Sequence, residues 1–308
     1  MACGHRVGGF SPRPRTQFTS TVQVAMSQII GGFQLVRKVA ESHSAEIFLA
    51  IRLAGKGRGG EYALKALRPQ FAHDPLYRGY LETEYRVCSR LEHPNLVRIL
   101  ELELNDVRPH LIMDFIPGRS LQMLLRRGRP SLLQSLAWLG QAADGLAYFH
   151  ELGYLHRDVK PQNIVVADES PVRVIDFALA CRQDATPLRH MMRKWFDRRR
   201  PGTWSYMSPE QIQNDRLTGQ SDVYSLGVTL YECLTGRVPY AGHRPQDLLD
   251  QHVRAPVPTV RSLNPDIPLP VDDFVRAMLA KDPLDRPQGM GYVSAMLRAL
   301  AEAYGRKG

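Results

Sequence analysis

The segment His156-Arg157-Asp158-Val159-Lys160-Pro161-Gln162-Asn163 is the part of the sequence from which the fold can be assigned. It follows residues 132–152, whose apolar side chains recur every three or four positions as on one face of a helix, and Gly153 is suited to end that helix. Residues 163–166 read Asn-Ile-Val-Val, which is typical of a short strand. The polar segment is therefore predicted to be a loop between a long helix and a strand.

A second polar motif, Asp176-Phe177-Ala178, follows the strand-like run 172–175. A carboxylate at the end of an apolar strand is unfavourable unless it is paired or bound to a metal ion. Asp176 is therefore a candidate functional group.

Further motifs occur in order along the chain. They are Ala63-Leu64-Lys65 in a predicted strand, Glu84 in the following predicted helix, Ser208-Pro209-Glu210, the segment 222–227 and Arg286. Taken alone, Lys65 or Glu84 would be interpreted as a solvated surface charge. The ordered set, which covers about residues 33–300, resembles the protein kinase family, and its core is similar to that of bacterial, eukaryotic-like serine/threonine kinases.

The resemblance implies phosphoryl transfer from ATP, in which a protein contributes mostly positioning and neutralisation of phosphate charge. It implies that Asp158 accepts or orients the proton of the attacking hydroxyl. Lys160 would contact the γ-phosphate, as in the serine/threonine branch. Asn163, also implied in catalysis, and Asp176 would be oxygen ligands of Mg²⁺, with Mn²⁺ as an alternative.

The resemblance also implies an ATP site between two lobes. Lys65 would hold the α- and β-phosphates as a compact cation, and Glu84 would pair with Lys65 and fix its direction. Met113 falls at the gatekeeper position, and residues 114–116 would present their backbone to adenine. The remaining implied nucleotide contacts are Ala40, Ile47, Ala63, Asp114, Ile116 and Val165.

Other matching residues are expected to support the fold. Asp222 resembles a buried acid that holds the catalytic loop, and Glu210 and Arg286 resemble a buried ion pair of the large lobe. The side chains expected to form a packing stack between the lobes are Cys88, His156 and Phe177.

The secondary-structure pattern predicts a two-lobed, α+β protein-kinase fold. Residues 33–116 form short strand-like runs with one helix, which Asp74-Pro75 should begin and which should reach about Leu91. Residues 219–304 are mostly helical in pattern. The expected parts are a flexible arm (1–28) and a kinase domain (29–308) made of a small antiparallel β lobe (29–116) and a larger helical lobe (117–308).

Two regions depart from the family pattern. The glycines of the family's GxGxxG loop would fall at Ala40, Ser42 and Ala45, and Ala178 replaces the glycine of the metal-binding motif. Glycine permits close backbone approach to phosphate and unusual dihedrals. An alternative therefore stays open, namely a pseudokinase that acts as a nucleotide-binding or scaffolding module. Phosphorylation of a small molecule is a third hypothesis, which Ser208-Pro209-Glu210 disfavours.

The composition, with 44% hydrophobic and 23% charged residues, is typical of a soluble globular protein. Four separated cysteines without a CxxC pair favour neither a disulfide framework nor a zinc site. No apolar run reaches the length of about 18 residues that a membrane-spanning helix needs. We expect a cytoplasmic protein without a membrane anchor. Met26 is a candidate for the natural start.

Much of the net charge of +9 comes from residues 182–200. Such a basic cluster has three interpretations: a solvated mobile loop, a surface for an acidic protein substrate or partner, or nucleic-acid binding, of which the last is disfavoured. The oligomeric state is not encoded in any pattern of the sequence.

Overall fold

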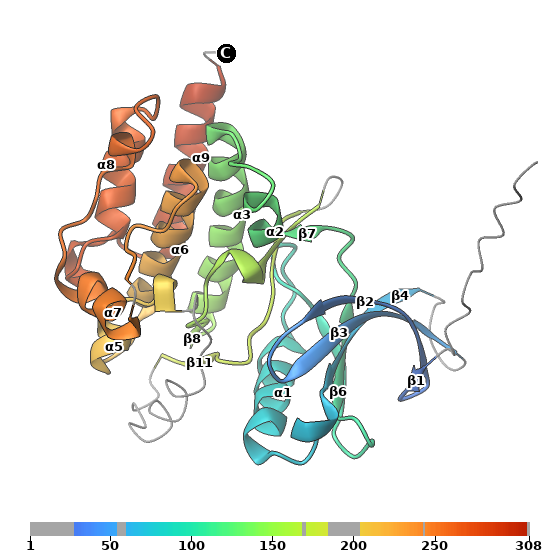
Figure 1. Cartoon of the computed structure of the whole chain (residues 1–308). Coiled ribbons are helices and arrows are strands. Elements are labelled where there is room, and N and C mark those ends of the chain that lie inside the picture. The colour runs from blue at the N-terminus through green and yellow to red at the C-terminus, as the bar shows by residue number, and fades with distance from the viewer. Residues whose placement is uncertain (1–27, 54–59, 168–170, 184–203, 243, 307–308) are drawn as a thin grey trace, which may run out of the picture.

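The computed structural model describes residues 28–53, 60–167, 171–183, 204–242 and 244–306, which form two lobes (Figure 1). The basic cluster lies largely outside these residues, as do most of the N-terminal arm and Met26.

The small lobe is a curled antiparallel sheet in the strand order β1-β2-β3-β4-β6-β5 (Figure 1). Its strands are β1 (Ile29–Ile30), β2 (Phe33–Glu41), β3 (Ala45–Arg52), β4 (Glu61–Leu67), β5 (Ile99–Glu103) and β6 (His110–Asp114). One face of the sheet buries a separate apolar cluster that includes Phe33, Phe48 and Leu64. The opposite face, which includes Leu67 and Leu111, contributes to the main core.

The single long helix of the small lobe, α1 (Pro75–Cys88), packs against β5 and β6. Asp74 is its N-cap and accepts a hydrogen bond from the Leu76 N–H, and Pro75 is its first residue, as predicted. The helix ends three residues before the predicted Leu91, because the chain turns at Ser89 and Leu91 is already held by the Cys88 carbonyl.

The large lobe is mostly helical, and α3, α6 and α9 lie side by side in it (Figure 1). Its helices are α2 (Leu121–Leu125), α3 (Leu132–Glu151), α5 (Pro209–Gln213), α6 (Gly219–Thr235), α7 (Pro245–Arg254), α8 (Leu269–Met278) and α9 (Met290–Gly305). Its short strands are β7 (Arg119–Ser120), β8 (Tyr154–Leu155), β9 (Ile164–Val166), β10 (Arg173–Val174) and β11 (Cys181–Arg182). Ser131 and Gln134 begin α3 with a capping box, which orders the helix that leads to the segment 156–163.

The two lobes share one core and a hydrogen-bonded junction. Leu96 and Val174 form a parallel bridge, in which the Val97 N–H donates to the Val174 carbonyl at 3.0 Å. Asn95 donates its side-chain amide to the Val172 carbonyl at 2.8 Å. The main apolar cluster includes small-lobe residues such as Leu111 and large-lobe residues such as Phe149. The two lobes are thus joined by hydrogen bonds and by a common apolar core.

Within the described ranges, no helix combines the length and apolarity needed to cross a membrane. Cys88, Cys181 and Cys233 are free thiols.

Candidate active site

Three charged side chains from distant parts of the chain meet at the centre of the site. Lys65 on β4 places its Nζ 2.7 Å from Glu84 Oε2 on α1 and 2.9 Å from Asp176 Oδ1. Lys65 and Glu84 are 8% and 1% exposed, whereas the Asp176 side chain retains 37%. The lysine is therefore fixed between a fully buried carboxylate and one that is partly buried.

The charges of these three side chains shift one another's pKa values. Burial alone would lower the pKa of Lys65, but the charges of Asp176 and Glu84 reverse this effect and raise it. Burial opposes ionisation of Asp176, yet the Lys65 charge and hydrogen bond lower its pKa to about 2. Burial raises the pKa of Glu84 against the opposing charge of Lys65. At neutral pH the arrangement keeps Lys65 charged and Asp176 ionised, as phosphate and metal binding require.

A second group lies in the loop 156–163. The Asp158 Oδ2 accepts hydrogen bonds from Lys160 Nζ at 2.7 Å and from Asn163 Nδ2 at 3.1 Å. Asn163 Nδ2 also donates to the Asp158 carbonyl at 2.8 Å, which fixes the amide so that its oxygen is the group left to bind a cation. The short 3-10 turn Pro161–Asn163 returns Asn163 to hydrogen-bonding distance of Asp158.

Asp222, at the start of α6, anchors this loop. Its carboxylate accepts the backbone N–H groups of His156 at 2.9 Å and Arg157 at 2.8 Å. His150 Nε2 lies 2.8 Å from the same carboxylate. Burial alone would raise the pKa of Asp222, but the hydrogen bond with His150 and the neighbouring charges lower it. Asp222 thus acts as a charged clamp, as the sequence predicted; the part played by His150 was not predicted.

Strained backbone occurs at two positions of the site. Arg157 and Asp176 have φ values of 66° and 65°, in the left-handed region that residues other than glycine seldom adopt. Such conformations persist where surrounding bonds impose them and are concentrated at functional sites. Ala178 is not among the described residues with positive φ, so the loss of glycine there does not strain this conformation.

Two members of the predicted packing stack, His156 and Phe177, are in contact. The ring centroids of His156 and Phe177 are 4.7 Å apart, and those of Phe177 and Phe149 are 5.0 Å apart. Cys88 is fully buried in the same core cluster. The ring contacts connect the loop 156–163 with α3, and Cys88 of α1 belongs to the same apolar core.

The residues implied for the nucleotide lie on two sides of the junction. Across the sheet, Ala40 pairs with Ile47, Ile47 with Lys65, and Ala63 with Met113, while Val165 lies on β9 of the large lobe. Ala63, Met113 and Val165 are each less than a tenth exposed.

The link between the lobes carries the remaining implied contacts. Asp114 ends β6, with its carboxylate near Arg98 and Arg173, and Ile116 follows as a half-buried residue that packs on the main core. A cavity of about 570 Å³ lies elsewhere, between the β1–β2 turn and the β5–β6 hairpin, and none of the implied nucleotide contacts lines it.

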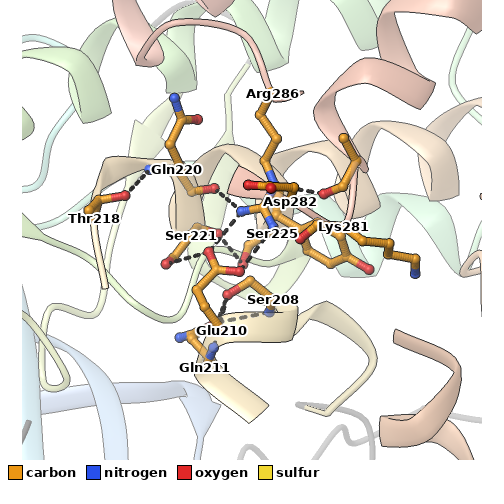
Figure 2. Close-up of polar contacts among 12 residues, drawn as sticks. Ser208, Glu210, Gln211, Thr218, Gln220, Ser221, Ser225, Lys281, Asp282 and Arg286 are labelled. Atoms are coloured by element: carbon orange, nitrogen blue, oxygen red, sulfur yellow. Dashed lines mark hydrogen bonds and ion pairs between the residues drawn. The ribbon is translucent and has the colours of Figure 1, made fainter. Parts of the chain in front are cut away.

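Glu210 and Arg286 form the predicted ion pair (Figure 2). Arg286 Nη1 and Nη2 lie 2.7 and 2.9 Å from the two Glu210 carboxylate oxygens, and both side chains are nearly inaccessible to water. Ser221 donates to Glu210 at 2.8 Å, and Arg286 also donates to the carbonyls of Gln220, Ala280 and Lys281. Every charged group of the pair is therefore hydrogen-bonded.

Comparisons with known proteins support the family resemblance. The model of the protein kinase domain matches residues 33–298. The chain is 33% identical over 263 residues to serine/threonine-protein kinase PknH of Mycobacterium tuberculosis, which covers 81% of this chain and 40% of PknH. It is 30% identical over 277 residues to serine/threonine-protein kinase PrkC of Bacillus subtilis, covering 90% and 41% respectively. The chain thus spans about two fifths of the length of these relatives.

Among solved structures, the kinase domain of Mycobacterium tuberculosis PknI has a similar fold, with a TM-score of 0.66 and 24% identity over 90% of this chain and 99% of that one. This likeness shows the two-lobed fold.

Proposed function

The chain belongs to the protein kinase family, and from this premise we propose that it transfers the γ-phosphoryl group of ATP to serine or threonine hydroxyls of proteins. The observation that carries the proposal is the position of Lys65, which is bonded to both Glu84 and Asp176. This contact places the buried cation of Lys65, which would bind phosphate, beside the partly exposed carboxylate of Asp176.

Each residue of the second group has a role in the proposed reaction. Asp158 orients the substrate hydroxyl and accepts its proton, because its carboxylate is held by Asn163 and has a cationic neighbour in Lys160. Lys160 binds the γ-phosphate in the presence of nucleotide. Phosphoryl transfer depends on such positioning and charge neutralisation more than on covalent chemistry by the protein.

The divalent cation is Mg²⁺ in this proposal, held by Asp176 and by the amide oxygen of Asn163. In the described part of the chain, no three His, Cys, Asp or Glu side chains form a metal cage. Mg²⁺ commonly binds one or two protein oxygens together with substrate phosphates, so this sparse donor set fits it. When bound, the ion neutralises charge on the phosphate oxygens.

Adenine lies between Ala63 and Val165 and against Met113 in the proposed complex. Ala40 and Ile47 cover the sugar and phosphates, and the backbone of residues 114–116 meets the adenine edge. The burial of the three central side chains supports an apolar slot of this kind.

We further propose that the basic cluster favours acidic protein substrates or partners. A cytoplasmic location and the domain division at 28/29 and 116/117 belong to the same proposal, and the free thiols support a reducing compartment.

The test is transfer of labelled γ-phosphate from MgATP to the protein itself and to a generic substrate, followed by phosphoamino-acid analysis. Label on serine or threonine is expected. A chain that binds MgATP without transferring phosphate would contradict the proposal and favour the pseudokinase alternative.

Replacing Lys65 with arginine is expected to lower kcat/KM for MgATP on the order of 10²-fold. The wider, planar guanidinium cannot occupy the space between Glu84 and Asp176 without displacing one of them, and small misplacements have effects of this size. Steady-state kinetics with Lys38→Arg, an exposed lysine on β2, as the matched control checks this. Equal activity of Lys65→Arg and wild type would contradict it.

A further inference from the structure

The turn between β2 and β3, residues 41–45, is closed by its own side chains although it contains no glycine. The Ser42 N–H donates to the Ala45 carbonyl at 2.8 Å, and the Ala45 N–H donates to Ser42 Oγ at 3.0 Å. Within the described part of the chain, the backbone N–H groups of His43 and Ser44 at the tip donate no hydrogen bond. The turn therefore has a defined shape before any ligand binds.

Arg68, the residue after strand β4, forms hydrogen bonds with this turn. Its Nε donates to the Ser42 carbonyl at 3.2 Å, and its Nη2 lies 3.0 Å from Glu41 Oε2. The Arg68 backbone N–H donates to the Ser44 carbonyl at 2.8 Å. Three separate bonds thus link the turn to the end of β4.

His43 attaches the tip of the turn to helix α1 through aromatic rings. Its ring centroid is 4.9 Å from that of Phe71 and 6.1 Å from that of Tyr77, and the Phe71 and Tyr77 rings are 4.6 Å apart. Tyr77 is buried on α1, two helical turns before Glu84 and on the same side of the helix. The tip is thereby joined to the helix that positions Lys65.

We propose that His43 and Arg68 are positioning residues for the nucleotide phosphates, an inference that rests on the proposed function. Together with Phe71 and Tyr77 they form a latch that holds the turn, which stands where the family's glycine loop would fall, and ties it to α1. A glycine loop must lose much conformational freedom when it closes on phosphate, whereas a turn that is already held loses less. In this chain the turn is thus held in its binding shape in advance, whereas a glycine loop would be flexible. Because the latch includes Tyr77 of α1, binding of phosphate is coupled to the position of Glu84 on the same helix.

Binding of MgATP, MgADP and adenosine, measured by calorimetry, tests the latch without turnover. In His43→Ala, the affinity for MgATP and MgADP is expected to fall about three- to tenfold, in line with the loss of aromatic contacts, while that for adenosine is unchanged. His43→Phe should restore nucleotide affinity, because it restores the aromatic contacts with Phe71 and Tyr77. His73→Ala, which removes an exposed histidine beyond Phe71, is the matched control and should match wild type.

Kinetics and a double variant sharpen the result. The KM for ATP should rise with the loss of affinity, whereas the KM for the protein substrate stays constant. Because His43 and Arg68 hold the same turn, His43→Ala and Arg68→Gln together should weaken MgATP binding by less than the product of their single effects. Unchanged MgATP affinity in His43→Ala, or an equal loss for adenosine, would overturn the latch alone. A wild-type chain that binds no ATP would overturn the proposed function and the latch together.

Discussion

Replacing Asp158 with asparagine is expected to lower phosphate transfer about 10³-fold while leaving nucleotide affinity nearly unchanged. Asparagine keeps the size of the side chain and part of the bonding to Lys160 and Asn163, but it cannot accept the hydroxyl proton. Loss of a positioned general base commonly reduces rates by about 10²–10⁴-fold. Single-turnover transfer from labelled ATP, beside calorimetric binding of MgATP, measures the two quantities separately.

A matched control for this variant is Asp273→Asn, which changes an exposed acid on α8 and leaves the catalytic loop intact. It should retain transfer within a few-fold of wild type, because only the exposed ion pair with Arg276 is altered. If Asp158→Asn kept more than a tenth of the wild-type rate, the assignment of Asp158 as the proton acceptor would be wrong.

The second large effect is expected on stability, from Glu210→Gln. This change leaves the Arg286 guanidinium buried beside a neutral amide, with a side-chain exposure of 0%. Removal of one partner of a buried ion pair destabilises a protein by about 3–5 kcal/mol. Thermal and urea unfolding should show this loss. The double variant Glu210→Leu/Arg286→Met should recover part of it, because no unpaired charge remains.

The exposed ion pair Arg244–Asp247 serves as a control that shows whether burial is what makes the Glu210–Arg286 pair stabilising. Its atoms are 2.8 Å apart, almost the same distance as in the buried pair, but the Arg244 side chain is 80% exposed. Asp247→Asn should leave the melting temperature almost unchanged, because solvent screens such pairs. An equally small effect of Glu210→Gln would contradict the stabilising role of the buried pair.

The pH dependence of this effect has a defined sign. Burial alone would raise the pKa of Glu210, but the hydrogen bonds and charge of Arg286 lower it below the ordinary value of 4.5. A lowered pKa in the folded state stabilises the protein above the ordinary pKa, and this contribution is lost as the pH falls through the folded-state pKa. The difference in stability between wild type and Glu210→Gln should therefore be complete at neutral pH and shrink below about pH 4.5.

The sequence was sufficient to predict the parts of the site that short motifs encode. The two-lobed fold, the start of α1 at Asp74 and the clamp by Asp222 follow from local patterns or from the order of the motifs, and the structure confirms them. Each of these features depends on one residue type in one local setting.

Other contacts depend on how distant segments pack, which no local pattern contains. The direct bond between Lys65 and Asp176 joins residues 111 positions apart. The pairing of His150 with Asp222 and the ring contact of His43 with Phe71 involve residues that, in sequence, are typical of ordinary surface positions. The replacement of glycine at Ala178 looked unfavourable in sequence, yet the unusual dihedral falls on Asp176 instead.

The parallel bridge between Leu96 and Val174, with the apolar cluster shared by both lobes, has a consequence for how the protein melts. Neither lobe can lose its packing without exposing apolar surface of the other. We therefore expect one calorimetric transition whose van't Hoff and calorimetric enthalpies agree, even though the molecule has two lobes. A nucleotide that contacts mainly the small lobe would then delay the melting of the distant helices α8 and α9 by the same number of degrees as that of the sheet.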